Sequence, residues 1–335
     1  MCFCHLYGMG FCYDDFRIIY FISIFVNMSA SIYIYYKALI FVQMNMSNMF
    51  DLSTLTSVVR LHIRFLANPL MIVLLCAKIT TIMNYISDFD DLVVRINDVS
   101  LKPYMLHFFG WLSITLVTEF IQLMTFHYRM DFRYLKISST VQFVISNVWL
   151  VTPVLIYIFL ISLVSHGIRE INNDITSMRA WRTHSQKWKE LQHAAIVLTN
   201  SVFGKIIIIF IMYTIMELTF FCFALYLSWR GNYFSELVAY FIILFVRAGL
   251  MFQLFRTSHS CKMEKQMKRT QILLNGTCKN TISDYKEFQF TSMYMLHTDF
   301  DFTPCNIFDI TYRNLVTIFT IIAAYAIFQI QMKLI

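Results

Sequence analysis

Residues 139–165 read STVQFVISNVWLVTPVLIYIFLISLVS and contain no Asp, Glu, Lys or Arg. A helix needs about 20 predominantly apolar residues to cross the hydrocarbon core of a bilayer. The stretch is long enough, so it predicts a membrane-spanning helix. Six other apolar blocks of similar length accompany it, and the seven predicted spans are 18–42, 66–87, 105–127, 139–165, 204–228, 237–257 and 312–332.

The composition of the whole chain agrees with this interpretation. The chain has 335 residues, of which 58% are hydrophobic and 14% are charged. Soluble domains average about 45–50% apolar and about 25% charged residues, so a soluble fold could not cover this much apolar surface. We therefore expect an all-α membrane protein in which residues 1–335 form a single domain of seven transmembrane helices.

The Lys and Arg residues indicate the orientation of the helices, because basic residues accumulate in cytoplasmic loops. The predicted loops on one side of the membrane hold 14 of the 27 basic residues, and those on the other side hold 7. This ratio predicts a cytoplasmic N-terminus and an extracellular C-terminus, and it accounts for the net charge of +7 without a nucleic-acid partner. Asn45 begins the sequon Asn45-Met46-Ser47 in the first predicted outer loop, so it is a candidate for glycosylation.

Two of the predicted inner loops carry helical patterns of their own. An apolar seam with a period of about 3.5 runs through 188–202, while Gln192 and its polar neighbours lie away from it. The members of the seam are Trp188, Leu191, Ala195, Leu198 and Val202. The seam predicts a helix that continues into the fifth span, and 259–274 form a second, basic helical stretch. We expect the segments 166–203 and 258–311 to form a cytoplasmic helical anchor.

Several short motifs in the last third of the chain resemble one family. Residues 200–204 read N-x-x-F-G, residues 288–309 contain F-Q-F, M-L-H and F-T-P-C-N-I-F-D in that order, and residues 324–332 read A-Y-A-I-F-Q-I-Q-M. These motifs are similar to those of insect gustatory receptors, which are related to insect odorant receptors and end in T-Y-h-h-h-h-h-Q-F. Ala324 and Met332 depart from that signature, whereas Tyr325 and Gln331 keep its spacing.

The resemblance implies a ligand-gated, non-selective cation channel that assembles as a homo- or hetero-tetramer in the plasma membrane of sensory neurons. In such channels the seventh helix of each subunit lines the pore, and the matching residues here are Tyr325, Phe328 and Gln331. An apolar ring can close a pore by dewetting, and an amide ring offers oxygens to a partly dehydrated cation. Phe328 and Gln331 are three positions apart and so share a helix face. The alternative is that both side chains pack against neighbouring helices.

The family binds its ligands among the second to sixth helices, in the outer half of the bundle. Polar groups inside a membrane are costly and usually face an interior, so they are the natural pocket candidates. The candidates are Glu119, Gln122, Gln142, Asn147, Glu217 and Arg247. Arg247 could pair with either glutamate, and the alternative reading of the whole set is an ion pair and interhelical hydrogen bonds that only stabilise the fold.

The ligand is expected to be a small-molecule tastant or contact pheromone. Sugar-sensing members of the family tend to carry an acidic residue directly after the signature Tyr, where this chain has Ala326. The resemblance therefore favours bitter or other non-sugar cues. An aromatic content of 17% suits partly apolar organic ligands, although the same side chains also suit contacts with membrane lipid.

Other classes of protein are less compatible with the sequence. A secondary transporter is the main alternative, but its usual internal repeats are not visible in the hydropathy pattern. A G-protein-coupled receptor would have the opposite orientation. The sequence has no Gly-rich phosphate loop, no H-E-x-x-H and no G-x-S-x-G, so we predict no enzyme activity, no metal site and no cofactor.

Overall fold

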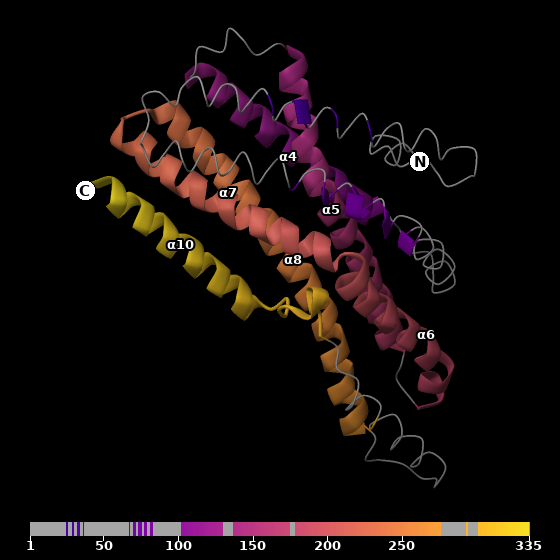
Figure 1. The fold of residues 1–335 in the computed structure, drawn as a ribbon. Helices are drawn as coiled ribbons and strands as arrows, with labels where there is room; N and C mark the ends of the chain where they lie inside the picture. The colour runs from indigo at the N-terminus through magenta and orange to yellow at the C-terminus, as the bar shows by residue number, and fades with distance from the viewer. Residues whose placement is uncertain are drawn as a thin grey trace.

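The computed structural model describes residues 102–129, 137–174, 178–275 and 301–334, together with Met293 and isolated residues within 25–36 and 67–82. These parts of the chain are helical apart from short connections at 203, 231–233, 301–303 and 307–311, and they contain no strand (Figure 1). The long helices are α4 (Lys102–Arg129), α5 (Ile137–Asp174), α6 (Met178–Val197), α7 (Gly204–Arg230), α8 (Phe234–Asn275) and α10 (Tyr312–Leu334). Two short turns are η3 (Leu198–Val202) and η4 (Pro304–Asn306).

Five of these helices are long and apolar enough to cross a membrane, and they cover the last five predicted spans. The apolar portions are Lys102–Gln122, Leu150–Asn173, Gly204–Arg230, Phe234–Glu264 and Tyr312–Met332. Helices α5 and α8 continue well beyond the predicted ends of their spans, at 165 and 257. The first two predicted spans, 18–42 and 66–87, lie largely outside the described residues, and the few described residues within them are helical.

The helices pack into a bundle whose centre is formed by α5 and α7. In the apolar portion of α5, 78% of the residues are buried, and in that of α7, 67%. The buried share is only 22% in α4 and also in α10. Helix α4 packs on α5 and α8, and α10 lies along one flank of the bundle against α7 and α8 (Figure 1). Helix α10 therefore has a broad face that no described part of this chain covers.

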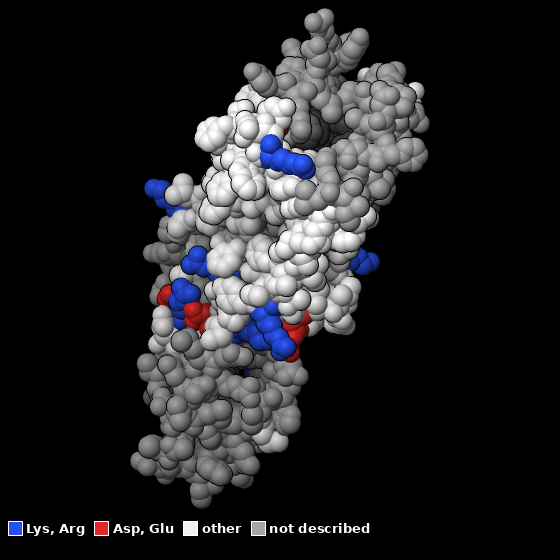
Figure 2. All heavy atoms as spheres, turned by 90° about the vertical axis from the view of Figure 1, so that its left-hand side faces the viewer, with Lys and Arg blue, Asp and Glu red and all other residues white. Residues whose placement is uncertain are grey.

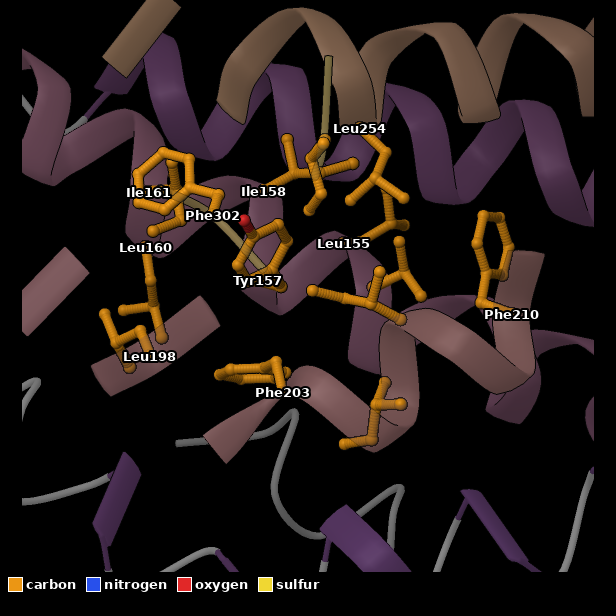
Figure 3. Packing of buried hydrophobic residues seen from close by; sticks show 14 of the residues in the cluster. Leu155, Tyr157, Ile158, Leu160, Ile161, Leu198, Phe203, Phe210, Leu254 and Phe302 are labelled. Carbon is orange, nitrogen blue, oxygen red and sulfur yellow. The ribbon is translucent and has the colours of Figure 1, made fainter. Parts of the chain in front are cut away.

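A buried cluster joins the helices at the end of the bundle where α6 meets α7. Its apolar members include Phe203 and Phe302, and Figure 3 shows Tyr157 among them. The Tyr157 hydroxyl lies 3.1 Å from the Thr199 hydroxyl and 2.9 Å from the Ser258 hydroxyl. Buried polar groups need such partners. The hydrogen bonds therefore tie α5, η3 and α8 together at one point.

The predicted seam is buried along its whole length, and the helix that carries it ends in a π-turn. All five seam residues are buried, as predicted. The helix predicted to continue into the fifth span does so through a π-turn at Leu198–Val202, after which α7 begins at Gly204. The Phe203 amide donates to the Leu198 carbonyl, five residues earlier, at 2.8 Å. Gln192, predicted to lie away from the seam, is buried as well.

Charged side chains are unevenly distributed on the face seen in Figure 2. Most acidic and basic atoms gather in the lower part of the described surface, and uncharged residues dominate above them. Two partly exposed ion pairs connect α8 to its neighbours. Arg169 on α5 bonds Glu264 at 2.7 Å, and Lys262 pairs with Asp301 in the segment before α10.

Candidate functional site

A buried ion pair lies between two membrane helices. Arg247 on α8 donates to the Glu119 carboxylate on α4, and the side chains are 3% and 0% exposed. The guanidinium carbon also lies 6.0 Å from the centre of the Tyr213 ring on α7, within range of a cation–π interaction. Glu217, one turn further along α7, is buried and acts on Arg247 electrostatically. Of the two glutamates that Arg247 could reach, the structure therefore pairs it with Glu119 and places the second nearby.

The same region holds buried polar groups whose hydrogen bonds are not made within the described part of the chain. Gln122 follows Glu119 by one turn of α4, and neither its side-chain oxygen nor its nitrogen has a described partner. The Thr214 hydroxyl and the Nε of Arg247 are also buried without a described hydrogen-bond partner. Buried polar atoms in native proteins are nearly always paired. These groups are therefore available to bind a polar atom of a ligand or water.

Three other predicted site residues are not placed in this cluster by the structure. Gln142 and Asn147 belong to the first third of α5, but their side chains lie outside the described residues. Asn45 also lies outside the described residues, so its glycosylation stays a prediction.

Helix α10 has one side packed on the bundle and the other exposed. The buried residues of α10 are Leu315, Ile322, Ala326 and Gln329. They are separated by intervals of 7, 4 and 3 residues, so they share one side of the helix, which we call the buried stripe. The three predicted pore residues lie off this stripe. Tyr325 and Phe328 are each 52% exposed, with their ring centres 6.2 Å apart, and Gln331 is exposed one turn further on. The described part of the chain does not bury Phe328 or Gln331, and both the pore role and the alternative of packing against neighbouring helices stay predictions.

Directly opposite the buried stripe lies a line of polar and small residues. Arg313, Thr317, Thr320, Ala324 and Gln331 are all exposed and are separated by intervals of 4, 3, 4 and 7. With about 100° of rotation per residue, these positions lie roughly half a turn away from the buried stripe. We call them the polar stripe. The polar stripe was not predicted, although the spacing of the two threonines within 312–332 indicates it.

The segment that leads into α10 is held by residues of the N-x-x-F-G motif. The side-chain oxygen of Asn200 accepts the Thr303 amide at 2.9 Å, and its nitrogen donates to the Asp301 carbonyl at 3.4 Å. A Cβ on Gly204 would lie 3.0 Å from both the backbone nitrogen and the sulfur of Cys305, so only glycine fits there without displacement. The motif therefore joins the start of α7 to the start of α10.

Comparisons with known proteins agree with this architecture. The family model described as "7tm Chemosensory receptor" matches residues 16–335. The insect olfactory receptor OR5 from Machilis hrabei has a similar structure, with a TM-score of 0.58 at 11% identity over 96% of this chain and 90% of that chain. The same receptor in complex with eugenol gives a TM-score of 0.56 at 12% identity over 96% and 91%. None of the curated protein sequences matches this chain.

At such low identity the structural likeness concerns the fold alone, which is that of a seven-helix membrane protein. The family match is independent of it and extends over nearly all of the sequence. The chain therefore belongs to the 7tm chemosensory receptor family, whose members are receptors rather than enzymes.

Proposed function

We propose that this chain is a subunit of a ligand-gated, non-selective cation channel of the gustatory type, in the plasma membrane of sensory neurons. The observation that carries the proposal is the polar stripe of α10, which faces away from its own bundle. Polar and charged side chains are costly in hydrocarbon. The same side chains become favourable when several copies of α10 surround a water-filled path, as they would in a homo- or hetero-tetramer.

The outer end of that path would be narrowed by Phe328 and Gln331. Both are exposed in the last two turns of α10, at the end predicted to be extracellular. A ring of Phe328 side chains supplies an apolar constriction, and a ring of Gln331 amides supplies oxygens for cations. Tyr325 packs near Phe328 and would support the ring from the next turn.

The ligand site would lie at the cluster of Glu119, Gln122, Glu217 and Arg247. Because Arg247 is already paired with Glu119, a neutral ligand that hydrogen-bonds Gln122 fits the cluster better than an ion. Tyr213 supplies an aromatic surface beside it. The olfactory receptor that shares this fold has been solved in complex with eugenol, a precedent for a small organic ligand of a receptor with this fold. We expect a bitter compound or another non-sugar contact cue.

Electrophysiology on cells that express the chain, alone and with other gustatory receptors, tests the channel. A ligand from a panel of bitter compounds and contact pheromones should open cation currents with resolvable unitary steps. Stoichiometric solute uptake without unitary currents would instead identify a transporter and overturn the proposal.

Gln122→Leu tests the ligand site once an activating compound is known. The substitution should raise the half-maximal ligand concentration about tenfold, because one hydrogen bond is worth about 1.4 kcal/mol. The maximal current should persist. Gln253→Leu is the matched control, since Gln253 lies in a membrane helix outside the cluster and contacts His107 at 3.3 Å. An equal shift in both variants, or none in Gln122→Leu, would place the ligand elsewhere.

A further inference from the structure

Arg313 stands in a position that the stability of α10 does not explain. It is the second residue of the helix, where the helix dipole favours negative rather than positive side chains. It is exposed and forms no ion pair with any described residue, Asp309 four positions earlier included. An unpaired positive charge at this end of a helix costs free energy. The accumulation of basic residues on the cytoplasmic side explains an Arg at this end, but not the side of the helix that carries it, so a second role is open.

The position of Arg313 around the helix suggests that role. Arg313 begins the polar stripe, one turn before Thr317 and two turns before Thr320. The Thr317 and Thr320 hydroxyls donate to the Arg313 and Val316 carbonyls at 3.1 and 2.9 Å. Each threonine oxygen retains lone pairs that can face water. The stripe is therefore polar over its first two turns, with a positive charge at its first residue.

We propose that Arg313 sets the rectification of the pore, by forming a ring of positive charge at its inner mouth. The inference rests on the proposed function, in which copies of α10 surround the permeation path. A ring of like charges in a narrow mouth lowers the local concentration of cations. Cations entering from the cytoplasm meet this ring first, so outward current is smaller than inward current. Arg313 is then a residue that tunes permeation, distinct from the constriction at Phe328 and Gln331.

The test is the ratio of outward to inward ligand-evoked current in inside-out patches with symmetric solutions. Arg313→Gln should raise this ratio at least twofold at about 0.1 M salt, and Arg313→Glu should raise it further. Arg313→Lys, which keeps the charge, should leave the ratio unchanged. The difference between Arg313→Gln and the unmodified chain should shrink at about 1 M salt, where the screening length falls from about 10 Å to about 3 Å.

Lys205→Gln is the matched control, because Lys205 is the exposed second residue of α7 and its loss removes the same charge from a different helix. Its current ratio should equal that of the unmodified chain. If ligand-evoked currents persist but neither Arg313→Gln nor Arg313→Glu changes the ratio, Arg313 faces lipid headgroups and the inference is wrong. A complete lack of ligand-evoked current from the unmodified chain and from its co-assemblies would instead refute the proposed function itself.

Discussion

Arg247→Met is expected to destabilise the protein by about 3–5 kcal/mol, because it leaves the Glu119 carboxylate buried without its partner. The double variant Glu119→Leu/Arg247→Met removes both charges and should recover most of the lost stability. Thermal unfolding of purified protein in detergent measures both effects. Arg256→Met is the control, since Arg256 is exposed on the same helix and its replacement should cost less than about 0.5 kcal/mol.

The double variant also separates the two readings of the ion pair. If the pair belongs to the ligand site, the folded double variant should respond to ligand only at much higher concentration. If the pair serves the fold alone, the same variant should respond normally. The single variant Glu119→Leu completes the cycle, and a stability loss in the double variant equal to the sum of the two single losses would show that Glu119 and Arg247 are not coupled, contrary to their contact in the structure.

Gln331→Arg is expected to reduce cation conductance at least tenfold. The substitution places one positive charge per subunit at the narrowest part of the proposed pore, where it repels cations directly. Single-channel recording measures the effect, and surface labelling confirms that the variant reaches the membrane. Gln331→Asn keeps the amide and should retain most of the conductance. Conductance and ion preference that are unchanged in Gln331→Arg would remove Gln331 from the pore.

The sequence predicted the helices well where apolar length alone decides the outcome. The charge-free run 139–165 lies inside α5, and 312–332 lie inside α10. The predicted helical stretch 259–274 lies inside α8, which ends at Asn275. The end of α5 at Asp174 was not predicted, because apolar length does not mark where a helix ends once it continues beyond its apolar run. The π-turn at Leu198–Val202 was also missed, since it depends on an extra residue between two packed helices and leaves no mark in the hydrophobic period.

The candidate site was predicted in part. Glu119, Glu217 and Arg247 were identified as charged residues within predicted membrane spans. A charge in hydrocarbon costs free energy, so such residues usually face the interior of the bundle. The choice of Glu119 as partner required the rotation of α4 relative to α8, which one sequence does not contain. The contact of Asn200 with Thr303 joins residues 103 positions apart, so only the folded chain shows what the N-x-x-F-G motif holds.

Cysteine accessibility along α10 tests most directly the central claim that the polar stripe faces water. Chains carrying Thr317→Cys, Thr320→Cys or Ile322→Cys would be treated in membranes with a small cationic methanethiosulfonate reagent. A thiolate in water attacks this reagent, forms a mixed disulfide and releases methanesulfinate. No native cysteine lies within residues 306–335. The mass of a proteolytic fragment from this region therefore reports modification of the introduced thiol alone. We predict rapid modification at positions 317 and 320 and none at 322, which belongs to the buried stripe. Modification at 317 and 320 no faster than at 322 would contradict the claim that α10 lines a pore.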